Sequence, residues 1–149
     1  MVTSPTQRNT TLMYVLSMLI ALIGMGDALY LTIKHLTGQS LKCSITNGCS
    51  VVLSSRYASF AGIPTAAFGV LAYFAVFSLA TLAVFGYQWA RTLLLAVVTP
   101  MLLMTLWLVY LQAFVLHAFC QYCLLSAVVT VMLTCLAYAA KFSLPAQDA

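Results

Sequence analysis

The sequence contains very little charge. Of its 149 residues, six are Lys or Arg and two are Asp or Glu. Charged residues therefore make up 5% of the chain, against roughly 25% of an average soluble domain. Eight charges cannot cover the surface of a soluble fold of this size, and six dispersed basic residues form no stripe that could follow a phosphate backbone. The composition excludes a soluble globular domain, a disordered chain and a nucleic-acid binder.

Long apolar segments take the place of charge. Hydrophobic residues make up 64% of the chain, and its mean hydropathy is +1.06. Helices of about 20 residues cross the hydrocarbon core of a bilayer, and in lipid the backbone must satisfy its hydrogen bonds within the segment. We therefore expect an all-α membrane protein, a four-transmembrane-helix bundle that forms a single domain over residues 1–149. The expected helices cover residues 12–33, 65–85, 92–116 and 120–140.

The connections between these helices are unequal. Residues 34–64 form a long loop after the first helix, and a long ordered loop in a small bundle is usually functional. Residues 50–60 mix apolar and polar side chains and are too short to span a membrane. We expect this part of the loop to be helical and to lie at the interface, either as a lid over the mouth of the bundle or as a plain connector.

Four crossings place both ends of the chain on one side of the membrane. The loop 34–64 and the short connection before residue 120 then lie together on the other side. The positive-inside rule does not orient the bundle, because the basic residues are divided equally between the sides. Arg8, Arg91 and Lys141 lie on the side of the chain ends, whereas Lys34, Lys42 and Arg56 lie on the loop side.

Four of the five cysteines fall on the loop side by this topology. Cys120 and Cys123 form a CxxC motif at the start of the fourth helix. Residues three apart share a helix face, and the unpaired N–H groups and dipole at a helix N-terminus favour a thiolate. The thiolate is the nucleophile of disulfide exchange, so this position suits a redox-active dithiol. A static disulfide or half of a zinc site remains an alternative.

The second pair, Cys43 and Cys49, lies in the long loop. Five residues separate the two cysteines and end in Asn47-Gly48, a turn signal that can bring the sulfurs together. A structural staple is one interpretation. The other is a relay, in which the loop pair meets a partner and the CxxC pair passes electrons into the membrane. Cys135, deep in the fourth helix, is expected to be a small core residue.

Two further ionisable residues lie near the cysteines in this topology. Asp27 is in the first helix, about two turns from the loop, and ionisable groups in lipid are functional candidates by default. A snorkelling or hydrogen-bonded structural role for Asp27 remains open. His117, just before the CxxC motif, is expected to be an interfacial residue, with proton relay as the alternative.

The ordered set of motifs resembles the vitamin K epoxide reductase family, in its bacterial branch. The resemblance runs from the first expected helix to the fourth. It rests on Gly24 to Leu31 with Asp27 and Tyr30, on Cys43 and Cys49, on Val52, Ser55, Tyr57 and Ala58, on Gly62-Ile63-Pro64, on Gly69 and Tyr73, and on Cys120-x-x-Cys123.

The resemblance implies a four-helix bundle that exchanges electrons between thiols and a quinone. It implies that Cys123 faces the quinone, that Cys120 is its partner and that Cys49 exchanges with Cys120. It also implies that Cys43 contacts a thioredoxin-like protein and that Ser55 lies near the quinone ring.

Position along the chain adds Thr65 and Phe68 as candidate quinone contacts. The quinone would be menaquinone, ubiquinone or phylloquinone, and no metal is expected.

Bacterial members support disulfide formation in exported proteins. Many carry a fused thioredoxin-like domain, and its absence here implies a separate, DsbA-like partner. Thiol oxidation belongs in an oxidising compartment, which implies a bacterial inner-membrane protein with cytoplasmic termini and extracytoplasmic cysteine loops.

Two alternatives remain at this point. The same fold could work in reverse and reduce vitamin K quinone or its epoxide at the expense of thiols. Animal members that do so carry Asn and Tyr where this sequence has Thr65 and Ala127, which weighs against that reaction. The other alternative is a non-enzymatic, cysteine-rich membrane protein that binds or transports metal.

Overall fold

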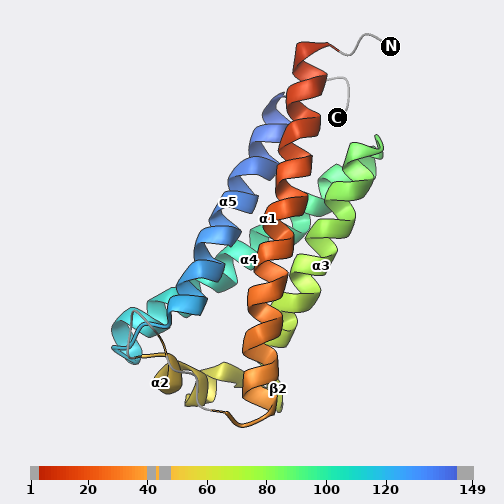
Figure 1. The fold of residues 1–149 in the computed structure, drawn as a ribbon. Helices are drawn as coiled ribbons and strands as arrows, with labels where there is room; N and C mark the ends of the chain where they lie inside the picture. Colours follow the sequence, from red (N-terminus) through yellow and green to blue (C-terminus); the bar gives the residue numbers. More distant parts are fainter. Residues whose placement is uncertain (1–3, 40–42, 44–47, 144–149) are drawn as a thin grey trace.

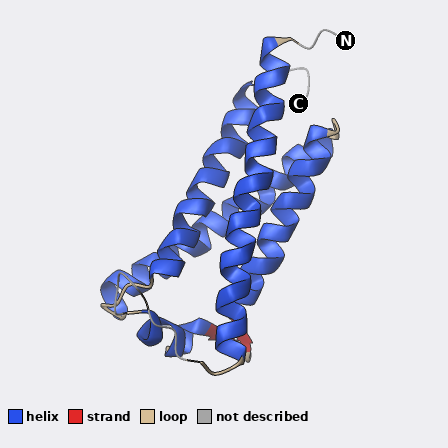
Figure 2. Ribbon diagram, viewed as in Figure 1, coloured by secondary structure: helices blue, strands red, loops and turns tan. Residues whose placement is uncertain are grey.

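Four long helices form the body of the protein (Figures 1 and 2). The computed structural model describes residues 4–39, 43 and 48–143. Each of the four helices is long and apolar enough to cross a membrane, which confirms the expected all-α membrane bundle. The helices are α1 (Pro5–Leu36), α3 (Thr65–Val84), α4 (Gln88–Tyr110), which continues into a π-helical turn, η2 (Leu111–Val115), and α5 (Gln121–Ser143).

The helix α1 begins seven residues before the apolar run that predicted it. The Ser4 side chain accepts a hydrogen bond from the Gln7 backbone N–H at 3.3 Å, and Pro5 occupies the first helical turn. A Ser cap followed by Pro is a strong helix start. Capping therefore extends α1 through polar residues that hydropathy leaves out. The helix α4 also begins earlier than expected, at Gln88 rather than at residue 92, although it has no side-chain cap.

The long loop is partly helical, as expected, and also contains a small hairpin. It holds α2 (Cys49–Ser54) and the 3-10 turn η1 (Arg56–Ala58), followed by the antiparallel strands β1 (Ser59–Phe60) and β2 (Ile63–Pro64). Figure 1 places this loop and the connection from η2 to α5 at one end of the bundle, and the start of α1 and the end of α5 at the other. Lys42 and Asn47 lie outside the described residues.

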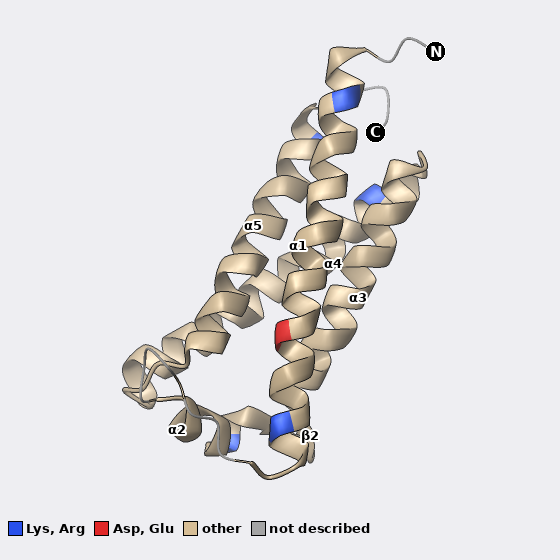
Figure 3. Cartoon of the chain, in the orientation of Figure 1, with Lys and Arg blue, Asp and Glu red and all other residues tan. Residues whose placement is uncertain are grey.

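The outer face of the bundle carries large apolar side chains, and the Lys and Arg positions lie near its ends (Figure 3). Large side chains such as Leu71 and Leu103 are more than 60% exposed on this face, as suits contact with lipid. Small residues occupy buried positions, among them Ala21, Ala80 and Ala137. Small residues let membrane helices approach closely and gain dispersion contacts.

Cys135 corrects an expectation drawn from the sequence. Instead of lying in the core, it is exposed on α5. The buried positions nearest to it are Leu133, Thr134 and Ala137, and a helix turns by 100° per residue. Cys135, which follows Thr134, therefore turns away from the core and faces outward to the lipid.

One tyrosine links three helices close to the loop end of the bundle. The ring of Tyr73 on α3 packs directly on Gly24 of α1, where an added Cβ would lie 2.5 Å from the ring. Its hydroxyl group lies 2.6 Å from Ser126 Oγ and 3.0 Å from Thr130 Oγ1, both on α5. Gly24 is therefore required here for close approach.

Candidate active site

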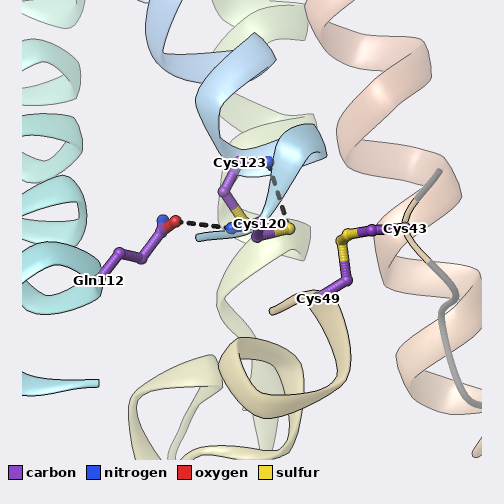
Figure 4. The surroundings of a disulfide bond; sticks show 5 residues. All are labelled: Cys43, Cys49, Gln112, Cys120 and Cys123. Atoms are coloured by element: carbon purple, nitrogen blue, oxygen red, sulfur yellow. Dashed lines mark hydrogen bonds between the residues drawn. A yellow bond between two sulfur atoms is a disulfide. The ribbon is translucent and has the colours of Figure 1, made fainter. Parts of the chain in front are cut away.

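The four cysteines of interest meet at the loop end of the bundle. Cys43 and Cys49 form a disulfide with their Cα atoms 5.7 Å apart. Cys49 and Cys120 are 1% and 0% exposed and belong to the same packed cluster, with Cys43 and Cys123 against it. In Figure 4 the sulfur of Cys120 lies between Cys123 and the disulfide. The two pairs that the sequence placed on one membrane face are thus in a single apolar cluster.

Gly48 makes this arrangement possible by close approach. A Cβ added at Gly48 would lie 2.6 Å from both the backbone N and the backbone O of Phe119. The φ of Gly48 is −95°, so glycine is needed here for space and not for a left-handed turn. Backbone contact one residue before Cys49 and one before Cys120 fixes the two cysteines against each other.

Cys120 occupies the capping position of α5. Its sulfur accepts a hydrogen bond from the Cys123 backbone N–H at 3.4 Å, so it takes the place of the oxygen in an ordinary N-cap. The Cys123 side chain donates a further hydrogen bond, which lowers the pKa of Cys120 to about 7 although burial opposes the shift. A stabilised thiolate favours the reduced state of a CxxC pair.

The pH dependence of this thiolate is testable. In the reduced protein, the Cys120 thiolate should appear as the pH rises through about 7, whereas an unperturbed cysteine titrates near pH 8.5. The thiolate fraction should rise about tenfold between pH 6 and pH 8. Ultraviolet thiolate absorbance of a Cys135→Ser background measures this titration. A transition near pH 7 that survives Cys120→Ser would contradict the assignment.

Gln112 is a site residue that the sequence analysis missed. It lies in the π-helical turn η2, is 3% exposed, and its Oε1 accepts the backbone N–H of Cys120 at 3.0 Å (Figure 4). Its backbone carbonyl also accepts the N–H of Ala118 at 3.1 Å. π-Helical turns often occur at functional sites. A lone glutamine in an apolar helix was the available signal, because a buried amide in lipid needs a specific partner.

A cavity of about 940 Å³ opens beside the CxxC motif. Cys123 lines it together with the three residues expected to contact a quinone, Ser55, Thr65 and Phe68. Its wall is mainly apolar, with aliphatic and aromatic side chains from α1, α3, α4 and α5. Pockets for small organic ligands measure about 300–1,000 Å³ and have apolar walls with few polar groups. The cavity therefore fits a flat, largely apolar acceptor such as a quinone ring.

The two hydroxyl groups in this set are already engaged with the backbone. Ser55 Oγ donates to the Val52 carbonyl oxygen at 2.7 Å, and Thr65 Oγ1 donates to that of Tyr57 at 3.1 Å. In this arrangement both hydroxyl groups can accept, but not donate, a further hydrogen bond. Their positions stabilise the loop that lies over the cavity.

Residues from α2, η1 and β1 form the loop-end wall of the cavity. This placement agrees with the lid interpretation of residues 50–60. Asp27 also lines the cavity, whereas His117 is exposed and has a positive φ of 50°. Asp27 thus lies beside the candidate site, while the structure shows His117 at the surface of the connection between η2 and α5.

The sequence matches the model of the Vitamin K epoxide reductase family over residues 15–138. The chain belongs to this family. Members of the vitamin K epoxide reductase family are membrane oxidoreductases that couple thiols to quinones, and the cavity next to a CxxC motif agrees with that chemistry. Within the described ranges, no group of three or more His, Cys, Asp or Glu side chains could hold a metal ion.

Proposed function

We propose that this protein oxidises the dithiol of a thioredoxin-like protein and passes the electrons to a membrane quinone. The observation that carries the proposal is the placement of Cys49 and Cys120 in one buried cluster, with Cys123 on the wall of the cavity. Disulfide exchange requires direct contact of sulfurs, and quinone reduction requires an apolar site next to a thiol. The shared cysteine cluster supports the first step, and the cavity beside Cys123 supports the second.

The relay begins at Cys43. Because Cys43 is partly exposed whereas Cys49 is buried, a thiolate of the partner attacks the sulfur of Cys43. The Cys43–Cys49 bond breaks, and a second partner thiolate resolves the mixed disulfide. The partner leaves oxidised, and the loop pair is left as a dithiol.

The second exchange moves the electrons to the CxxC pair. The Cys49 thiolate attacks Cys120 of an oxidised Cys120–Cys123 pair, and Cys43 resolves the new bond to restore the loop disulfide. The resulting Cys120–Cys123 dithiol is stabilised by the lowered pKa of Cys120. A quinone in the cavity accepts two electrons and two protons, and the Cys120–Cys123 disulfide forms again.

The same chemistry gives the proposed orientation of the protein in the membrane. Disulfides persist in oxidising compartments, so the loop end, with all four cysteines, faces the extracytoplasmic side and the ends of α1 and α5 face the cytoplasm. The product then supports disulfide formation in exported proteins.

The test is an assay of the purified protein in detergent or nanodiscs. A reduced DsbA-like protein and short-chain analogues of menaquinone or ubiquinone are added, and quinol formation is followed. We expect one quinol for each partner disulfide formed. Oxidation of the partner without formation of quinol would contradict the proposal. Quinol formation that occurs only when the epoxide and quinone forms of vitamin K are supplied with small thiols would also contradict it.

A further inference from the structure

Asp27 has no part in the relay described above. It lies within α1, nine residues before the end at Leu36, which corresponds to roughly 13 Å along the helix. The sequence has two acidic side chains, Asp27 and Asp148, and only Asp27 lies among the described residues. In Figure 3 the acidic position falls within the body of α1, away from the basic residues at the ends. An ionisable group at this depth is costly and marks a functional position.

No hydrogen bond among the described residues accounts for the burial of Asp27 Oδ2. Asp27 lines the same cavity as Cys123, and its Oδ2 atom is buried without a hydrogen-bond partner in the part of the chain that the structure describes. Burying an unpaired carboxylate costs far more than burying the neutral acid. The unpartnered position of Oδ2 therefore favours the neutral acid over the carboxylate, and a protonated carboxyl has one O–H to donate.

The neighbouring hydroxyl groups cannot easily supply this proton. Ser55 and Thr65 donate to backbone carbonyls, and the Tyr73 hydroxyl lies among three oxygens of Ser126 and Thr130. The other titratable or charged groups on the cavity wall are His35, Arg56, Tyr57, Tyr73 and Cys123. His35 is in the last turn of α1, at the loop end. Arginine does not release a proton in proteins, and Cys123 is the electron donor.

We propose that Asp27 is the proton donor to the quinone oxygen at this site. This proposal rests on the proposed quinone reduction. Two S–H bonds of Cys120 and Cys123 break and one S–S bond forms, which releases two electrons and two protons. The O–H bond of Asp27 breaks as a new O–H bond forms on the acceptor. One thiol proton restores Asp27, the other completes the quinol, and the reaction is balanced as dithiol plus quinone to disulfide plus quinol.

The first test separates binding from proton transfer. Trp107 lines the cavity, so quenching of its fluorescence by a menaquinone analogue in a Trp89→Phe background reports binding. Asp27→Asn keeps a hydrogen-bond donor but has no acidic proton. We expect it to bind the analogue within about threefold of the parent affinity, and to form quinol about 10²-fold or more slowly at saturating quinone. Asp148→Asn is the matched control and should leave both quantities unchanged.

The second test needs no turnover and no substitution of Asp27. A menaquinone analogue is added to the fully oxidised wild-type protein, in which no electrons can flow. The infrared carbonyl band of a protonated carboxyl should shift to lower frequency, because its O–H now donates to the quinone oxygen. The sequence has only two acidic side chains, so Asp148→Asn, which should keep the band, assigns it to Asp27.

The outcomes distinguish the two proposals. Unchanged quinol formation in Asp27→Asn, or the absence of a quinone-sensitive carboxyl band in the wild type, would overturn the role of Asp27 and leave the relay intact. Loss of binding with a normal rate at saturating quinone would also overturn it, because Asp27 would then only hold the ligand. If the wild-type protein forms no quinol, the proposed function itself fails, and the role of Asp27 fails with it.

Discussion

Replacing Cys123 with alanine should abolish quinol formation. Cys123 is the CxxC cysteine on the wall of the large cavity, whereas Cys120 is 0% exposed within the cysteine cluster. Without the Cys123 sulfur, the second pair cannot form its disulfide, and two electrons have no route from the thiols to the acceptor. We expect the rate of quinol formation to fall by ~10³-fold or more, for both protein and small dithiol donors.

The chain offers a matched control on the same helix. Cys135 is exposed on the outer face of α5, so Cys135→Ala removes a sulfur without touching the cysteine cluster and should keep full activity. Trapping adds a second readout, because Cys123→Ala should accumulate a mixed disulfide between Cys49 and Cys120. Normal quinol formation in Cys123→Ala would eliminate the relay as the mechanism.

Removing the loop disulfide should block oxidation of a protein donor and spare oxidation of a small dithiol. In Cys43→Ser the loop disulfide cannot form, so the partner protein has no partly exposed sulfur to attack. We expect oxidation of a DsbA-like protein to fall by at least ~10²-fold. A small dithiol that diffuses to the oxidised Cys120–Cys123 pair should still produce quinol at a rate close to that of the wild type.

The measurement is the ratio between the rate of quinol formation with the DsbA-like protein and the rate with the small dithiol. Cys49→Ser should give the same ratio, because both variants remove the same disulfide. Equal loss with both donors would mean that the Cys43–Cys49 bond is a structural staple of the loop. A circular-dichroism melt of each variant shows whether the bundle itself is still intact.

Gly48 and Gln112 show where reasoning from the sequence stopped. The Asn47-Gly48 dipeptide suggested a turn, but Gly48 has a negative φ and is needed because the backbone of Phe119 lies against it. Gln112 was one polar residue in an apolar segment, and only the π-helical turn η2 places its amide oxygen on the N–H of Cys120. The role of Gly48 depends on a contact between segments distant along the chain. The role of Gln112 depends on how the chain folds back between η2 and α5.

Cys135 failed as a prediction for a different reason. In a soluble helix an apolar residue is expected on the buried face, but in lipid both faces of a helix are apolar. Hydropathy then no longer reports which face packs against the other helices. Cys120 and Cys123 could be placed because the start of a helix, unlike its rotation, is marked in the sequence.

The sequence by itself determined the number of membrane helices and the end of the bundle at which four cysteines meet. Those features follow from the length of the apolar runs, from the parity of the crossings and from the position of the CxxC motif. Only the tertiary structure decided that Cys49 and Cys120 share one buried cluster, that Gln112 holds the backbone of Cys120, and that Asp27 borders the cavity with Cys123. These depend on how each helix is rotated about its axis and how closely the segments approach, and van der Waals contacts between side chains fix both.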